Sequence, residues 1–205
     1  MVVTEKNFDV LINDLIVSPA IGFDVETYGL GFHDRLFSLA LATANESYYL
    51  NFNYAADHLG NYPKAVLPRD HLRFLDFAFI SEDKLWLSHN AAFDIQKLRL
   101  EGLQGPRIVH CSYVAERIIR NDSMDLSLEA VAKKYGYAKD MTVDKYIDEH
   151  KLYTQVVLPG KERKEKLKHF DKVPFEIISA YGETDARIHR EVGLTQYEEH
   201  FGVRQ

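Results

Sequence analysis

Two carboxylates interrupt an otherwise apolar stretch near the start of the chain, Ile21-Gly-Phe-Asp-Val-Glu-Thr-Tyr-Gly-Leu30. If this stretch is a β-strand, its side chains alternate, so Asp24 and Glu26 share a face with Gly22 while the apolar residues point the other way. Two neighbouring like charges are costly unless a cation lies between them or one carboxylate takes up a proton. Carboxylate oxygens are natural ligands of magnesium and manganese. Alone, the pair is more typical of an exposed strand end than of a metal site. Other acids elsewhere in the chain therefore decide between these two interpretations.

Two further segments place polar side chains where helical periodicity predicts burial. Asn90 and Asp94 are four residues apart in one predicted helix, and Tyr181 and Asp185 are four apart on an apolar stripe of the last helix. Acids from distant parts of the chain could therefore converge: Asp24, Glu26, Asp94 and Asp185. Four converging carboxylates commonly bind two divalent ions about 3.5 to 4 Å apart, which stabilise the attacking and leaving oxygens of a phosphoryl displacement. These residues predict metal-assisted phosphodiester chemistry.

The composition is that of one globular domain. Its 205 residues, 46% of them hydrophobic and 27% charged, suit a single domain over 1–205 with a substantial core. The lone cysteine, Cys111, excludes an internal disulfide and a multi-cysteine zinc site, so we expect a reducing, cytoplasmic location, the host cytoplasm if the chain is phage-encoded. No apolar run reaches the roughly 18 residues of a transmembrane helix, and we expect no membrane partner.

The net charge of −6 argues against broad attraction to nucleic acid or to anionic lipid. It leaves room for a local site, because a catalytic cluster of acids raises the negative count and bound metals reverse the local field. The net charge therefore excludes a protein that binds nucleic acid through a broadly basic surface, but it does not exclude a nuclease.

Periodicity and turn residues predict an α/β domain whose strands and helices position these groups. Strands come first and then alternate with helices, which indicates a mixed sheet. The expected elements are a helix capped by Thr4 and ended by Ser18, strands over 21–27, 36–43 and 47–52, a loop over 53–68, a helix over 69–80, a strand over 84–88, a helix opening at His89, a strand over 107–110, a helix through Val114 and Ile118, a helix capped by Ser127, and a last helix from Pro174 to about Phe201 with a weak point at Gly193.

Residues 139–172 have the least core-like composition of the chain. Within them, Lys161–Lys172 carries six Lys or Arg against three acids. A mixed charge run of this kind is most typical of a solvated loop or helix face. The functional alternative is a flexible arm on the substrate side that guides a nucleic-acid strand through phosphate contacts.

Three phrases of the sequence together resemble a known family. In order and spacing, residues 23–30, 89–94 and 181–186 resemble the three exonuclease motifs of the DEDDy 3′-to-5′ exonucleases, most closely the proofreading domains of bacterial and phage family A DNA polymerases. The segment 125–135 is similar to the helix that these domains carry between the second and third motifs. The resemblance covers nearly the whole chain. It implies a ribonuclease-H-like exonuclease fold, with a mixed central β-sheet flanked by α-helices.

The resemblance also implies the catalytic roles. Asp24, Glu26 and Asp185 would hold the first of two divalent ions, Mg²⁺ or Mn²⁺, and Asp24 would serve the second ion with Asp94 nearby through water. Tyr181 would orient or deprotonate the attacking water. With a free pKa of about 10 it is a poor base at neutral pH, so most activation would come from the metal.

Substrate contacts follow in the same way from the resemblance. Leu30 corresponds to the wedge against the terminal base, Phe93 to an aromatic residue that contacts the terminal nucleotides, and Asn90 to a hydrogen-bonding residue near the scissile strand. Thr27 joins them as a nucleic-acid-binding residue. For Leu30 and Phe93, plain core packing is an equally typical role.

The preferred interpretation is a metal-dependent DNA exonuclease that releases 5′-mononucleotides from a single-stranded 3′ end, with a DNA polymerase subunit or domain as its partner. An RNA exonuclease similar to ribonuclease D is an alternative, because discrimination depends on how closely the pocket approaches the 2′ position. A noncatalytic polymerase-associated subunit is another, although the intact acids argue against it. A free-standing enzyme and an excised domain both stay open, and a helix predicted directly after Met1 favours a natural N-terminus.

Overall fold

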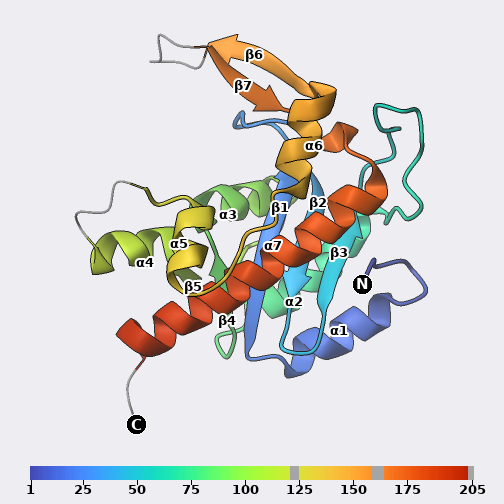
Figure 1. Cartoon of the computed structure of the whole chain (residues 1–205). Coiled ribbons are helices and arrows are strands. Elements are labelled where there is room, and N and C mark those ends of the chain that lie inside the picture. Colours follow the sequence, from blue (N-terminus) through green and yellow to red (C-terminus); the bar gives the residue numbers. More distant parts are fainter. Residues whose placement is uncertain (121–124, 158–163, 203–205) are drawn as a thin grey trace.

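The computed structural model describes residues 1–120, 125–157 and 164–202. Figure 1 shows a central sheet whose five strands are β1 (Ala20–Thr27), β2 (Leu36–Ala42), β3 (Ser47–Asn51), β4 (Leu85–Ser88) and β5 (Ile108–Cys111). Their order is β3-β2-β1-β4-β5, and β1 pairs antiparallel with β2 but parallel with β4. The predicted mixed sheet is confirmed, and the strand that carries Asp24 and Glu26 is its central strand.

Helices pack on both faces of this sheet. The described helices are α1 (Phe8–Val17), α2 (Asp76–Phe79), α3 (Ala91–Leu100), α4 (Ser112–Ile119), α5 (Leu128–Lys134), α6 (Thr142–His150) and α7 (Phe175–Gln196), with 3₁₀ turns at Arg69–Leu75 and Phe170–Lys172 and a π-helical extension of α7 over Tyr197–Phe201. Strands β6 (Tyr153–Val157) and β7 (Lys164–Lys168) form a separate antiparallel pair. Within the described ranges, no helix is both long and apolar enough to cross a membrane.

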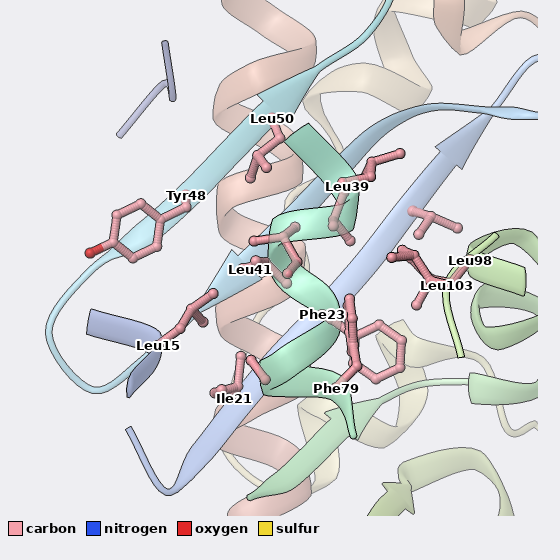
Figure 2. Close-up of a cluster of buried hydrophobic side chains, with 14 of the residues drawn as sticks. Leu15, Ile21, Phe23, Leu39, Leu41, Tyr48, Leu50, Phe79, Leu98 and Leu103 are labelled. Atoms are coloured by element: carbon pink, nitrogen blue, oxygen red, sulfur yellow. The ribbon is translucent and has the colours of Figure 1, made fainter. Parts of the chain in front are cut away.

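The apolar face of β1 anchors the main hydrophobic core. Ile21 and Phe23 are fully buried there, and Phe23 meets the Trp86 ring edge to face at 5.7 Å. Phe79 stacks on Trp86 at 4.3 Å and lies beside Phe23 in Figure 2. Because side chains alternate along a strand, this burial turns Asp24 and Glu26 to the opposite face, toward α7.

Helix α7 crosses β1 at very short range because glycine leaves room for it. A Cβ atom added at Gly22 would lie 2.2 Å from the Ala186 carbonyl oxygen and 2.7 Å from Arg190 Cβ. Gly193 works similarly, since an added Cβ would lie 2.6 Å from Leu87 Cδ2. The predicted weak point at Gly193 is therefore wrong: α7 runs continuously through it, and the glycine lets the helix approach β4.

Two predicted helix boundaries differ from the structure. Thr4 does not cap α1; its backbone N–H and hydroxyl donate to Asn7 Oδ1 at 2.6 and 2.9 Å, which forms a turn, and the helix begins at Phe8. Most of the helix expected over 69–80 is a 3₁₀ helix, with only Asp76–Phe79 α-helical. Helix α4 forms as expected, yet its residues Val114 and Ile118 are exposed.

The segment 139–172 is not a simple loop. It contains α6, the β6–β7 hairpin and a 3₁₀ turn. Val143 and Ile147 of α6 are fully buried in a second hydrophobic cluster that includes Tyr49 and Tyr181, so part of this segment belongs to the core. Residues 161–163 of the predicted basic stretch lie outside the described residues.

Candidate active site

The four predicted acids lie on three elements that meet at one face of the sheet. Asp24 and Glu26 project from β1, Asp94 from the first turn of α3 and Asp185 from the middle of α7. Asp94 and Asp185 are each only 3% exposed. The charges of the group act on one another: Asp185 on Asp24, and Asp24, Asp185 and Asp94 all on Glu26. The tertiary structure therefore brings together all four residues that the sequence proposed.

Their protonation shows how unfavourable this cluster is without a countercharge. Burial, and then the neighbouring charge of Asp185, raises the pKa of Asp24 to about 7. Burial and the charge of Asp24 raise the pKa of Glu26 well above its ordinary value, and the same two causes raise the pKa of Asp94. A site that resists ionisation in this way gains stability when a cation binds.

Two further side chains, Ser88 and His189, hold the acids and β1 in place. The Ser88 hydroxyl, at the end of β4, donates to Asp94 Oδ2 at 2.5 Å. His189, one turn after Asp185 on α7, bonds through Nδ1 to the Phe23 carbonyl oxygen at 2.8 Å. Because that carbonyl can only accept, Nδ1 carries the proton, and it lies 3.9 Å from Asp24 Oδ1.

Lys139 supplies a positive charge inside the cluster. Its Nζ atom lies 3.4 Å from Asp185 Oδ2 and 5.5 Å from the centre of the Tyr181 ring. Burial alone would lower the pKa of Lys139, but the charges of Asp185, Asp144 and Asp24 outweigh it and raise that pKa. The side chain is thus a charged ammonium group at neutral pH.

Tyr181 lies at the edge of the acid cluster. Its side chain is buried, and burial together with the charge of Asp185 raises its pKa far above the ordinary tyrosine value. The phenol therefore stays protonated at neutral pH and can orient a water molecule by hydrogen bonding, but it cannot serve as a base without a change in its surroundings. Phe170 supports it, with ring centres 6.3 Å apart.

The donor set suits a hard divalent cation. Carboxylate oxygens are the preferred ligands of Mg²⁺ and Mn²⁺, and Asp185 Oδ1 is buried without a hydrogen-bond partner in the described part of the chain. Among the described residues, no three His, Cys, Asp or Glu side chains are already gathered in metal-binding geometry. Asp24, Glu26, Asp94 and Asp185 are the residues that would hold the metal, in place of the Lys139 ammonium beside Asp185.

A cavity of about 190 Å³ opens beside Glu26 at the end of β1. Its lining includes the apolar side chains of Leu30, Phe93, Leu167 of β7 and Phe170. Leu30 is 63% exposed, which excludes the core-packing role for this residue, whereas Phe93 is half-buried against the main core. Apolar and aromatic side chains in the lining are suited to contact with the face of a nucleobase.

The loop that carries Leu30 is fixed by a buried lysine. Lys97 of α3 is fully buried, and its Nζ donates to the backbone carbonyl oxygens of Gly31 at 2.5 Å and Asp34 at 2.9 Å. Asp34 Oδ2 in turn accepts from the Gly31 backbone N–H at 2.6 Å. Thr27 also lines the cavity, but its hydroxyl donates to the Gly29 carbonyl oxygen at 2.6 Å and so braces the same loop.

Asn90 lies exposed immediately before α3, with a left-handed backbone conformation at φ 61°. Asparagine tolerates this region better than most residues. Because of this conformation the chain leaves β4 at Ser88 and α3 begins at Ala91 rather than at His89, so that Asp94 lies on the side of Asp24. Asn90 lines a second, more polar cavity together with His89 and Lys139.

Sequence reasoning missed four side chains of this region. Ser88 and His189 had a usable signal, since Ser88 directly precedes the second motif and His189 is four residues after Asp185 on the same helical face. Lys97 and Lys139 had none, because no periodic pattern in the sequence indicates that a lysine will be buried.

The family comparison matches a 3′-5′ exonuclease model over residues 1–193. None of the curated proteins compared with the chain matches its sequence. Among solved structures, an RNase D of Trypanosoma brucei is 14% identical with a TM-score of 0.66, covering 100% of this chain and 65% of its own. The POL domain of Pol1 from M. smegmatis is 10% identical with a TM-score of 0.61, over 97% of this chain and 27% of that one. Brucella melitensis NrnC with bound Mg²⁺ is 17% identical with a TM-score of 0.56, over 90% and 75%. At these identities the likeness concerns the fold.

Proposed function

Because the chain belongs to the 3′-5′ exonuclease family, we propose that it is a metal-dependent exonuclease that hydrolyses the terminal phosphodiester of single-stranded DNA and releases 5′-mononucleotides. The observation that supports this most directly is the convergence of Asp24, Glu26, Asp94 and Asp185 beside Tyr181 and the cavity at the end of β1. The chain spans 27% of the M. smegmatis Pol1 chain. We therefore also propose that the exonuclease acts together with a polymerase domain or subunit.

The four acids would hold two divalent ions, Mg²⁺ or Mn²⁺, whose chemistry is to lower the pKa of water and to stabilise charge on the phosphoryl oxygens. The buried phenol of Tyr181 donates a hydrogen bond that orients the attacking water. The Ser88 hydroxyl and the His189 ring hold Asp94 and β1 in position. Phe170 lies beside the Tyr181 ring, with ring centres 6.3 Å apart.

The terminal nucleotide occupies the cavity beside Glu26. Leu30, Phe93, Leu167 and Phe170, which line this cavity, contact its base. A paired terminal nucleotide must first separate from its complement to enter the cavity, which costs a few kcal/mol and less when the end is mismatched. Stacking against the freed base offsets part of that cost at about 1 to 3 kcal/mol per aromatic-stacked base.

An RNA substrate is the second candidate. The observation that favours it is the whole-chain likeness to the T. brucei RNase D, although a likeness at 14% identity concerns the fold alone. The two substrates differ at the 2′ position, so cleavage rates on DNA and RNA of one sequence decide between them.

The test is incubation of 5′-labelled single-stranded DNA and RNA of one sequence with Mg²⁺ or Mn²⁺. The proposal predicts a ladder that shortens from the 3′ end, faster for DNA, and no cleavage in EDTA. Asp24→Ala and Asp185→Ala should each remove nearly all activity, whereas Asp83→Ala, at an exposed carboxylate away from the cluster, should retain it. Internal cuts, or wild-type rates for Asp24→Ala, would contradict the proposal.

A further inference from the structure

A second cavity, of about 580 Å³, adjoins the acid cluster on the side of α4 and α5. Its lining residues come from four places in the chain: the end of β4, the first two turns of α4, the start of α5 and the segment before α6. They are His89, Asn90, Tyr113, Arg117, Leu126, Ser127, Leu128 and Lys139. In Figure 1, α4 and α5 lie at the left of the sheet and the β6–β7 hairpin at the top. Residues of α4 and α5 line this cavity, whereas residues of β7 line the cavity beside Glu26.

The lining has the chemistry of a surface that binds single-stranded nucleic acid. None of the eight described lining residues is acidic, on a chain whose net charge is −6, and two of them, Arg117 and Lys139, are basic. Tyr113 is 37% exposed and meets the His89 ring edge to face at 5.8 Å, so its own face is held in a fixed orientation. Basic side chains beside an exposed aromatic face are the usual arrangement for phosphates and stacked bases.

This cavity borders the proposed cleavage site through Lys139 and Asn90. Lys139 lines it and at the same time places its Nζ 3.4 Å from Asp185 Oδ2. Asn90 lines it and directly precedes the helix that carries Asp94. Burial lowers the pKa of His89 to about 4, so this ring is neutral and offers hydrogen bonds rather than charge. A strand whose last nucleotide lies in the cavity beside Glu26 can therefore continue past the acids into this one.

Building on the proposed exonuclease function, we propose that this cavity binds the nucleotides upstream of the scissile bond, with Tyr113 stacking on a base and Arg117 contacting a backbone phosphate. Both residues are on α4, four positions apart and therefore on one face of the helix. Neither was indicated by the sequence motifs. Both residues would contribute to substrate binding, and their contribution would be larger for longer strands, which reach this cavity.

Length dependence gives the test. Initial rates are measured for wild type, Tyr113→Ala and Arg117→Gln on 5′-labelled single-stranded dinucleotides, tetranucleotides and octanucleotides of one sequence. We expect kcat/KM on the octanucleotide to fall about tenfold in each variant, mainly because KM rises. A tenfold loss matches the lower end of the binding free energy that one stacked base contributes. The loss should shrink as the strand shortens. For Arg117→Gln the slope of log affinity against log salt should fall by about 0.7, the amount expected for one phosphate on a single strand.

Matched controls and a second readout separate this inference from the proposed function. Arg120→Gln, at the end of the same helix, and Tyr62→Ala, an exposed tyrosine in the 53–68 loop, lie outside the cavity lining and should behave as wild type. Fluorescence anisotropy of the octanucleotide in EDTA reports binding even if no cleavage occurs. Wild-type binding and rates in both variants at every length would overturn the inference while leaving exonuclease activity intact. An equal loss at all lengths would also overturn it, because the residues would then act at the cleavage site or on the fold.

Discussion

The ammonium group of Lys139 lies 3.4 Å from Asp185 Oδ2 and over the ring of Tyr181, so the acid cluster contains a positive charge of its own. This charge belongs to a segment that sequence composition marks as the least core-like. A metal ion bound by Asp185 would compete with it, because both interact with the same carboxylate oxygen.

Replacement of Lys139 tests that competition. Lys139→Met should lower the melting temperature of the protein in EDTA, because a buried carboxylate loses its partner, and should tighten Mn²⁺ binding measured by isothermal titration calorimetry without nucleic acid. Lys133→Met, an exposed position on α5, is the control and should change neither quantity. Weaker metal binding in Lys139→Met would show that the lysine supports the metal site rather than competing for it.

The stability of the metal-free protein should fall as the pH rises. The pKa of Asp24 is raised from 3.8 to about 7, so between these values the folded state binds more protons than the unfolded state and the free energy of unfolding decreases. Melting temperatures in EDTA should therefore decline from about pH 4 to about pH 7, and Mg²⁺ should restore stability at the upper end. Asp24→Asn should flatten the profile. A wild-type profile that rises across this window would contradict the repulsion described for the cluster.

Tyr181→Phe should reduce cleavage without abolishing it. Positioning of water or proton transfer by one side chain contributes about 10²- to 10⁴-fold to the rate, and the four acids proposed to bind metal are unchanged in this variant. Single-turnover rates on single-stranded DNA measure the effect, with Tyr137→Phe as a control on a phenol that contacts Thr195 instead. A loss as complete as that of Asp185→Ala would assign Tyr181 a larger role than orienting water.

The initial cleavage rate should fall in the order single strand, mismatched 3′ end, matched duplex end. The terminal nucleotide must leave its partner to enter the cavity of about 190 Å³. Leu30→Ala and Phe93→Ala should weaken binding of the 3′ terminus without changing Mn²⁺ affinity. The measurement is initial rates on three 5′-labelled substrates at one salt concentration, because phosphate contacts make affinity salt-dependent. Equal rates on single strands and matched duplex would contradict the need for strand separation.

Gly22→Ala should be strongly destabilising. The added Cβ would lie 2.2 Å from the Ala186 carbonyl oxygen, so α7 must move away from β1, at a cost of about 1 to 3 kcal/mol in the free energy of unfolding. Gly60→Ala is the comparison, because that position has φ +86° but nothing within 4 Å, and it should cost only about 1 kcal/mol from backbone strain. Urea denaturation measures both. A Gly22→Ala variant as stable as wild type would mean that the contact between β1 and α7 is looser than described.

The sequence by itself determined which face of the fold carries the acids. Alternation along residues 21–27 separates Asp24 and Glu26 from Phe23, and four-residue spacing places Tyr181 with Asp185. Both patterns are local, since they follow from the period of a strand or a helix, and so they survive any tertiary arrangement. The order of the three motifs then indicated the family, which the match over residues 1–193 confirms.

Only the tertiary structure decided which charges surround those acids and how the segment 139–172 folds. Lys97 is a charged residue on a predicted helix, and Lys139 lies in a stretch without apolar periodicity, so nothing local predicts that Lys97 is buried or that Lys139 reaches the acid cluster. Contacts with Gly31 and Asp185, more than 40 positions away, determine both. Val143 and Ile147 anchor α6 in the same way, through packing against residues of β3 and α7. Such interactions join residues that are far apart in the sequence, and these residues come into contact only when the sheet and α7 have packed together.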